Sequence, residues 1–200
     1  YDNDGRLDVW ITRYVDHSFT NNKVCVPYND KNIRGYCTPQ VYNGLSNVLY
    51  HNEGGGRFID VSQKAGLTGH LGKGLGLTVL DFNDDGYSDV YVANDSVANF
   101  LFRNNNDGTF SEVALESGVA LDENGHPQAG MGTFSGDIDG DGRQDIVVTN
   151  LDFEYLAVYR NLGRGIFEDA STRTGVQLAS RAFVGFGVAL LDFDNDADLD

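Results

Sequence analysis

The chain has 200 residues, with 30 acidic and 14 basic side chains and a formal net charge of −16. This length is sufficient for a domain with a substantial core. The acidity argues against a nucleic-acid partner, because phosphate binding requires clustered Lys and Arg. No apolar run reaches the length of about 18 residues that a membrane span requires, so no span is predicted in this segment.

Much of the acid is concentrated in four short stretches that share one pattern. Asp or Asn alternates with other residues, a glycine usually follows, and Asp closes the stretch at the ninth position. In chain order the stretches are residues 2–8, 81–89, 137–145 and 192–200. Clustered carboxylates repel one another unless a cation lies among them, so the pattern indicates a divalent metal.

Each acidic stretch belongs to a longer repeat of short apolar runs that predict strands. The runs after the first stretch are 9–12, 48–52 and 57–61. The second repeat has a Gly-x-Gly run at Gly74 and Gly76, and then runs at 90–93, 100–104 and 109–113. The third has Gly130 and Gly132, and then 146–149, 157–161 and 166–170, and the fourth has Gly185 and Gly187. The runs are rich in β-branched and aromatic residues, turn formers separate them, and long helical periodicity is missing.

A repeat of about four strands over roughly 50 residues has the size of a propeller blade. We therefore predict an all-β fold of β-propeller blades, each of four antiparallel strands with a DxDxDG calcium loop. The Gly-x-Gly run fits the innermost strand, where neighbouring blades crowd and a side chain would not fit. The chain 1–200 is then one partial propeller with units 1–73, 74–129, 130–184 and a truncated 185–200. A β-sandwich array remains the alternative.

The first unit contains an insert at residues 14–46, which holds both cysteines, Cys25 and Cys37. A loop this long without strands of its own is usually functional or stapled. A Cys25–Cys37 disulfide is the predicted staple in an oxidising compartment. Zinc binding through both cysteines and His17, or free thiols, are the alternatives. The insert also bears aromatic side chains and is the candidate contact surface.

The acidic stretches differ from EF-hand loops, which carry a bidentate Glu at the twelfth position between two helices. Counted from Asp137 the twelfth residue is Val148, and counted from Asp81 it is Val92. Both lie in predicted strands. The pattern therefore predicts a shorter calcium loop that closes on its ninth residue and continues into a strand.

We expect one Ca²⁺ in each loop, with oxygen ligands from positions 1, 3, 5, 7 and 9. Glycine at position 6 permits the positive φ of the turn, and position 7 offers its backbone carbonyl. The predicted ligands are Asp2, Asp4, Arg6 and Asp8 in the first loop, and Asp81, Asn83, Asp85, Tyr87 and Asp89 in the second. They are Asp137, Asp139, Asp141, Arg143 and Asp145 in the third, and Asp192, Asp194, Asp196, Asp198 and Asp200 in the fourth.

Three features qualify this ligand set. The first loop lacks its position 1, because the chain begins at Tyr1. The fourth has Ala197 in place of glycine, which predicts a strained and therefore weakest site. Asp84, at position 4, should point to solvent. The alternative for all four loops is a set of Asx-turns without metal.

The Asp-x-Asp-x-Asp-Gly-x-x-Asp loops with preceding Gly-x-Gly strands resemble the FG-GAP/VCBS repeats of integrin-α-like propellers. More narrowly, the chain is similar to the cartilage acidic protein family and its bacterial relatives with an ASPIC/UnbV-type C-terminal domain. The segments that carry this resemblance are GYCTPQVYNGLSNVLYHNEGGGRFIDVSQKAGL, GHPQAGMGTFSGDIDGDGRQDIVVTN and AFVGFGVALLDFDNDADLD.

The resemblance implies a calcium-binding propeller, commonly of seven blades, that is secreted or on the cell surface and acts in adhesion or binding. The chain starts and stops inside a calcium loop, so we expect a segment of about three and a half blades, with the remaining blades of its parent protein as partners. An extracellular, cell-surface or periplasmic location follows from the same resemblance.

The leading hypothesis for function is a non-catalytic recognition or adhesion module for a glycan or an extracellular protein. The four histidines, His17, His51, His70 and His126, stand in unrelated contexts, and no hydrolase, metalloprotease or phosphate-binding motif is present. The alternatives are the propeller portion of a polysaccharide-acting or other extracellular enzyme, and a structural spacer. Asn94-Asp95-Ser96 forms a glycosylation sequon at a predicted strand end.

Overall fold

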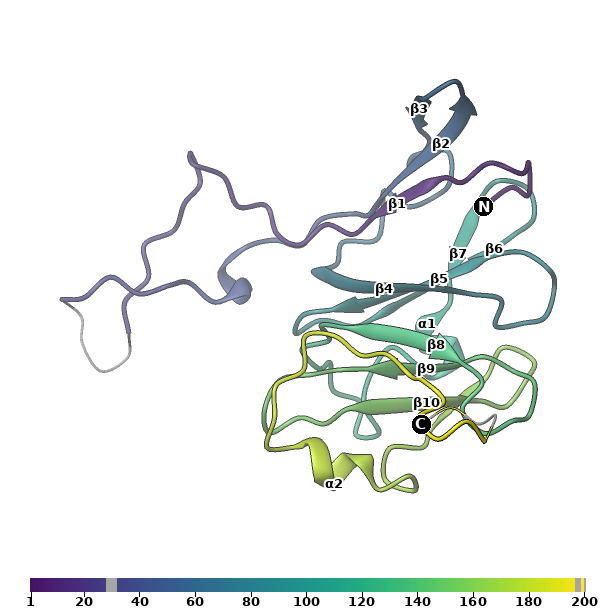
Figure 1. The fold of residues 1–200 in the computed structure, drawn as a ribbon. Coiled ribbons are helices and arrows are strands. Elements are labelled where there is room, and N and C mark those ends of the chain that lie inside the picture. The colour runs from purple at the N-terminus through teal and green to yellow at the C-terminus, as the bar shows by residue number, and fades with distance from the viewer. Residues whose placement is uncertain (28–31, 197–198, 200) are drawn as a thin grey trace.

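The structure, a computed structural model, describes residues 1–27, 32–196 and 199. Three antiparallel sheets follow one another along the chain and stack in the same order (Figure 1). The first sheet contains β1 (Val9–Ile11), β2 (Val48–Gly54) and β3 (Arg57–Asp60). The second contains β4 (Gly74–Leu80), β5 (Asp89–Asn94), β6 (Phe100–Asn104) and β7 (Phe110–Glu112). The third contains β8 (Thr133–Gly136), β9 (Asp145–Val148), β10 (Ala157–Asn161) and β11 (Phe167–Asp169).

The predicted all-β class is confirmed. Each sheet is a meander in which strands that follow one another in the chain pair antiparallel. The helices of the described residues are the short α1 (Ala114–Ser117) and α2 (Val176–Ser180) and a 3₁₀ turn at Pro39–Val41. None of these helices has the length and apolar character needed to cross a membrane. The first sheet has three strands among the described residues.

The three sheets share one register, which confirms that they are copies of one repeat. In each sheet an asparagine at or near the end of one strand pairs with a phenylalanine of the next, outermost strand. These strand pairs are β2 and β3, β6 and β7, and β10 and β11. The pairs are Asn52 with Phe58, Asn104 with Phe110, and Asn161 with Phe167. The extra length of the first repeat therefore lies in its insert.

The strands that follow the second and third acidic loops are buried on both faces, as their apolar sequences predict, whereas β1, after the first loop, is exposed at Val9 and Ile11. Every residue of β5 and of β9 is buried. One core, with Leu49, Val92 and Phe102, joins the first and second sheets, and a second core, with Tyr91 and Ile146, joins the second and third. Stacking of sheets thus explains why these strands do not alternate between apolar and polar residues.

The Gly-x-Gly runs lie where neighbouring repeats approach most closely. A Cβ atom added at Gly76 would lie 2.3 Å from the carbonyl oxygen of Met131. One added at Gly132 would lie 2.7 Å from the Cα of Gly187. A side chain cannot be accommodated at these distances, which is the physical reason for the glycines.

The fourth Gly-x-Gly run does not form the predicted strand. The structure assigns no strand to residues 184–191, although Gly185 donates its N–H to the carbonyl of Asn150 at 3.2 Å. An added Cβ would contact Thr149 at Gly185 but nothing within 4 Å at Gly187. This segment therefore follows the third sheet without a regular ladder.

The insert at residues 14–46 extends away from the sheets (Figure 1). Cys25 and Cys37 form a disulfide with a Cα–Cα distance of 5.2 Å, which confirms the predicted staple and excludes zinc or free thiols at these cysteines. The base of the insert is fixed by Asp16, whose carboxylate accepts the Asn43 N–H at 3.0 Å and its side-chain amide at 2.8 Å.

Candidate metal centres

Two of the acidic loops each close a hairpin between two strands. The residue before the second loop, Leu80, pairs with Asp89, and the residue before the third, Gly136, pairs with Asp145. Position 9 therefore opens the next strand, as predicted, and no helix flanks either loop. The loops are not EF-hands. The ends of each loop are held by the sheet, and its carboxylates are free to converge.

Two residues of each of the first three loops adopt left-handed backbone conformations, and position 4 of the fourth loop does so too. The predicted glycine at position 6 has positive φ in the first three loops, at 83° for Gly5, 83° for Gly86 and 85° for Gly142. Position 4 also has positive φ, which the sequence analysis missed, at 58° for Asn3, 57° for Asp84, 73° for Gly140 and 61° for Asn195. Its signal was present in the sequence, because Asn, Asp and Gly are the residues that tolerate this region best.

The carboxylate at position 1 organises the middle of the loop. In the third loop Asp137 accepts the N–H of Asp141 at 3.1 Å and that of Gly142 at 2.8 Å. Asp81 accepts the equivalent bonds in the second loop at the same two distances. The position 5 carboxylates then accept the N–H of position 7, at 2.8 Å for Arg6, 2.9 Å for Tyr87 and 3.0 Å for Arg143.

The carboxylate at position 9 joins the loop to the sheet. Asp89 accepts the N–H of Phe82 at 3.2 Å and that of Asn104, on β6, at 2.7 Å. Asp145 accepts the equivalent bonds at 3.0 and 2.7 Å, from Ile138 and Asn161. Asp8 accepts hydrogen bonds from the amine of Tyr1 at 2.8 Å and from the N–H of Asn52 at 2.9 Å.

Burial makes these position 9 carboxylates costly to ionise. Asp89 is 0% exposed and Asp145 is 1% exposed. Desolvation, reinforced by the neighbouring loop carboxylates, raises the pKa of Asp89 to about 7 and raises the pKa of Asp145 above its ordinary value. A bound cation would offset this cost, because an opposite charge favours the ionised form.

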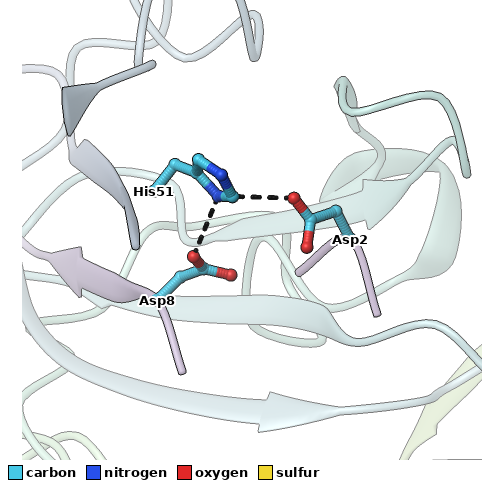
Figure 2. A group of neighbouring side chains, drawn as sticks. All are labelled: Asp2, Asp8 and His51. Carbon is cyan, nitrogen blue, oxygen red and sulfur yellow. Dashed lines mark hydrogen bonds and ion pairs between the residues drawn. The ribbon is translucent and has the colours of Figure 1, made fainter. Parts of the chain in front are cut away.

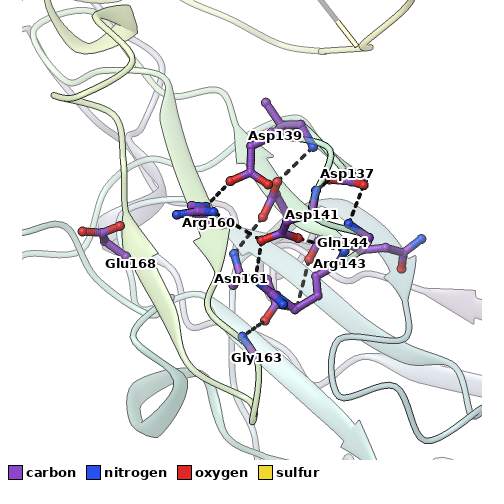
Figure 3. A network of polar contacts seen from close by, with 12 residues as sticks. Asp137, Asp139, Asp141, Arg143, Gln144, Arg160, Asn161, Gly163 and Glu168 are labelled. Atoms are coloured by element: carbon purple, nitrogen blue, oxygen red, sulfur yellow. Dashed lines mark hydrogen bonds and ion pairs between the residues drawn. The ribbon is translucent and has the colours of Figure 1, made fainter. Parts of the chain in front are cut away.

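Three of the loops bring side-chain ligand atoms within 4.8 Å of one another. In the third loop Asp137, Asp139 and Asp145 form such a group. Figure 3 shows two of them, Asp137 and Asp139, beside Asp141 and the two arginines of this site. In the first loop the group is Asp2, Asp8 and His51, and in the fourth it is Asp192, Asp194 and Asp196. Ala197, Asp198 and Asp200 lie outside the described residues.

Two predicted ligands of position 5 turn toward arginines instead. Asp4 accepts hydrogen bonds from the N–H and the guanidinium of Arg6, which lower its pKa. Asp141 pairs with the guanidinium groups of Arg143 and Arg160. Although burial opposes it, the Arg143 N–H and these two charges lower the pKa of Asp141. Arg160 also pairs with Asp139, so the third loop carries its own counter-charge.

The second loop holds an oxygen atom without a donor. Its position 3 is the amide of Asn83, so its carboxylates alone form no group of three among the described residues. The Asn83 Nδ2 donates to Asp85 at 3.0 Å, whereas its Oδ1 is buried and has no hydrogen-bond partner. Buried acceptors normally have a donor or an ion. This orphan oxygen, among carboxylates, fits the oxygen ligands that a hard divalent cation takes.

Asparagines that the sequence analysis missed connect neighbouring loops. Asn104 donates its side-chain amide to the carbonyl of Tyr1 at 2.7 Å, and Asn161 donates to that of Phe82 at 2.9 Å. Tyr1 and Phe82 each stand at position 2 of the preceding repeat's loop. The signal available in the sequence was the recurrence of Asn at the end of the second run after the acidic stretch, at Asn52, Asn104 and Asn161 in the first three repeats.

The glycosylation sequon is closed off by the fold. Asn94 is 0% exposed, and its Nδ2 donates to the carbonyl of Ala98 at 2.8 Å. The predicted strand-end position is correct, but β5 lies between two packed sheets. A glycan therefore cannot be attached to Asn94 in the folded chain.

The comparisons with known proteins agree with the repeat pattern. A family profile described as FG-GAP-like repeat matches residues 1–92, 81–148 and 137–200. Cartilage acidic protein 1 of Homo sapiens is 34% identical over 145 residues, which is 70% of this chain and 20% of the human protein. The Xenopus tropicalis protein of the same name is 33% identical over 144 residues, covering 70% of this chain and 21% of that protein. The chain thus spans about a fifth of the length of the curated relatives it matches.

One solved structure is more distantly similar. It is a lectin of Agrocybe aegerita, solved for its specific recognition of non-reducing terminal N-acetylglucosamine, with a TM-score of 0.35 and 20% identity. The likeness covers 68% of this chain and 38% of the lectin. Likeness of this degree carries no argument about the ligand of the present chain.

Proposed function

Because the chain belongs to the FG-GAP-like repeat family, we propose that it is a calcium-binding segment of a β-propeller that acts as a non-catalytic extracellular recognition or adhesion module. The observation that carries the calcium proposal is the convergence of oxygen ligands in the acidic loops. Asp137, Asp139 and Asp145 approach within 4.8 Å, and the buried Oδ1 of Asn83 lacks a donor.

The ligands in this proposal are the predicted ones. In the second loop they are Asp81, Asn83, Asp85, Asp89 and the carbonyl of Tyr87. In the third they are Asp137, Asp139, Asp141, Asp145 and the carbonyl of Arg143, with Asp141 released from its arginines. The ion neutralises carboxylates that repel one another and fixes the turn between two strands. Affinities of about 10⁻⁴–10⁻³ M suffice in extracellular calcium.

The recognition surface in this proposal is the disulfide-stapled insert at residues 14–46. Phe19 and Tyr36 are fully exposed there, and a groove beside the disulfide is lined by Lys23, Arg34, Tyr36 and Tyr42. Exposed aromatic and cationic side chains are typical of binding surfaces. Their ligand is a glycan or an extracellular protein, and the disulfide supports an extracellular, cell-surface or periplasmic location.

The calcium part is tested by thermal unfolding of the whole chain in calcium and in EGTA. We expect calcium to raise the melting temperature, because it binds the folded loops and not the unfolded chain. Asp85→Ala should reduce this rise. Asp84→Asn should preserve it, because Asp84 is an exposed acid at position 4 of the same loop and Asn tolerates its positive φ. Equal melting temperatures in both buffers would refute the proposal.

The recognition part is tested separately by binding of the whole chain to arrayed glycans and extracellular proteins. Substitution of Tyr36 and Arg34 by Ala should abolish a signal that Phe58→Ala, an exposed aromatic outside the insert, leaves intact. If the insert variants bind as the parent does, the surface lies elsewhere.

A further inference from the structure

One position beside the acidic loops differs in its chemistry between the repeats. The residue before the repeated asparagine is His51 in the first repeat, Arg103 in the second and Arg160 in the third. The strand registers make the three equivalent, since each precedes the asparagine that pairs with the outer-strand phenylalanine. In the third repeat, Arg160 extends over its loop and pairs with Asp139 and Asp141.

In the first repeat an imidazole occupies this position and faces two carboxylates. Figure 2 shows the Nδ1 atom of His51 between Asp8 and Asp2. It lies 3.2 Å from the Asp8 Oδ1 and 3.3 Å from the Asp2 Oδ2. The side chains are partly or largely buried, with exposed fractions of 20% for His51, 29% for Asp2 and 5% for Asp8. A neutral imidazole has a single N–H to donate, so it cannot satisfy both oxygens through Nδ1.

These separations suit a shared metal ion. Ligand atoms at about 2.1 Å from one ion lie roughly 3.0–3.4 Å apart in octahedral or tetrahedral geometry. The Nδ1–oxygen separations of 3.2 and 3.3 Å fall within that range. Asp8 Oδ1 also accepts the Asn52 N–H at 2.9 Å, but a carboxylate oxygen has a second lone pair for a metal.

We propose that the first acidic loop is a mixed nitrogen–oxygen site for a first-row transition metal such as Zn²⁺, with His51, Asp2 and Asp8 as ligands. Calcium takes oxygen ligands almost exclusively, whereas imidazole suits zinc and its neighbours. The other described loops present oxygen ligands alone. This inference rests on the proposed function, that the acidic loops hold cations, and it assigns one loop a different ion.

The competing role for His51 is that of a cation. A protonated imidazole would pair with both carboxylates as Arg160 pairs with the third loop, and no metal would bind. Substitutions can separate the two roles. His51→Arg keeps the positive charge and removes the ligand, while His51→Gln removes both. Loss of zinc binding in both variants supports ligation, whereas retained binding in either excludes His51 as a ligand.

Arg160→His provides the converse test in the third loop. There Asp139 and Asp145 stand at positions 3 and 9, as Asp2 and Asp8 do in the first loop. The substitution recreates the three ligand types on an equivalent backbone. If the assignment of ligands is correct, this variant gains a second site for the same metal.

The experiment is titration of the metal-free whole chain with Zn²⁺ by calorimetry, and with Co²⁺ by visible absorption, in buffer that contains calcium. We expect one site in the parent chain, weakened by about tenfold or more in His51→Arg and His51→Gln, and two sites in Arg160→His. Co²⁺ absorption should report a nitrogen ligand in the parent and lose it in the His51 variants.

Zinc binding in either His51 variant that equals binding in the parent overturns the inference, as does the absence of zinc binding in the parent. Circular dichroism and calcium titration of the same variants show whether the fold and the other loops are intact. If calcium binds and zinc does not, the inference fails alone. If neither ion binds, the proposed function of the loops fails as well.

Discussion

The second and third acidic loops have the same backbone and different counter-charges. Asp81 and Asp137 accept equivalent backbone bonds at identical distances. Around the third loop, however, Arg160 pairs with two carboxylates, whereas the second loop carries the unpartnered amide oxygen of Asn83. The comparison teaches that the two nonapeptides form the same turn, while Asn83 inside one loop and Arg160 on β10 beside the other determine the charge that each loop presents.

The largest effect should come from position 9, where both loops behave alike. Asp145→Ala leaves the N–H groups of Ile138 and Asn161 without their acceptor. We expect it to lower the free energy of unfolding by about 3 kcal/mol or more, because two buried N–H groups lose their only side-chain acceptor. Asp89→Ala should match it. Urea denaturation in EGTA measures both, and a cost below about 1 kcal/mol for either would contradict the shared scheme.

A smaller effect is expected from the asparagines that join successive loops. Asn161→Ala removes side-chain bonds to Phe82, in the second loop, and to Gln144, in the third. The expected cost is about 1–3 kcal/mol of unfolding free energy, since buried carbonyls lose their donor. Asn104→Ala, at the equivalent position, should behave alike. Asn105→Ala, at an exposed neighbour, is the control, and equal stability of all three would argue against loop coupling.

The difference between the two loops in their arginine partners can be tested by replacing each arginine with a neutral residue. Arg160→Gln should strengthen calcium binding at the third loop by about tenfold, because the guanidinium no longer competes for Asp139 and Asp141. Arg103→Gln should change calcium affinity at the second loop by no more than about twofold, since Arg103 is exposed and, among the described residues, its side chain forms no hydrogen bond or ion pair with that loop. The two sites are resolved by calcium titration of Arg160→Gln in a chain whose second loop cannot bind, and of Arg103→Gln in a chain whose third loop cannot bind. A larger gain in Arg103→Gln would reverse the comparison.

The smallest effect concerns pH at the second loop. The folded pKa of Asp89 is raised to about 7, so ion binding must displace a proton below that pH. Between about pH 7.5 and pH 6.5 we expect calcium affinity at this loop to fall about threefold. In EGTA, folding stability depends on pH in the opposite direction from calcium affinity. The contribution of Asp89 to stability is fully present below its unfolded pKa of about 4 and is lost as pH rises through about 7.

Calcium titrations at several pH values, and melting curves in EGTA over the same range, measure both consequences. Asp81→Asn is the comparison, because its wild-type carboxylate is partly exposed. Calcium affinity that does not depend on pH in the chain with its third loop disabled would show that Asp89 is ionised before the ion arrives.

Much of the fold could be predicted from the sequence, because the repeat is marked by glycines that the backbone geometry requires. The glycines of the Gly-x-Gly runs are required where Gly76 meets Met131, and the loop glycines are required by positive φ. Apolar runs such as β5 showed burial on both faces. The disulfide followed from two cysteines in one long insert. The number of blades and the closure of a propeller stay predictions.

The parts that the sequence did not reveal depend on contacts between repeats. Nothing in the spacing indicated that His51 and Arg160 face the loops, because their strands are joined to those loops only through the fold. The same holds for Asn161, which contacts a loop 79 residues away in the chain. The fourth Gly-x-Gly run was expected as a strand, but its regular pairing depends on neighbours that the local pattern does not describe.

The central claim is that the acidic loops are cation sites. A crystal structure of the whole chain grown in calcium tests it most directly. We predict electron density for an ion bounded by Asp137, Asp139 and Asp145, and for a second that contacts the Oδ1 of Asn83. The account would be contradicted if, at saturating calcium, both loops contained water and no ion and Arg160 still paired with Asp139 and Asp141.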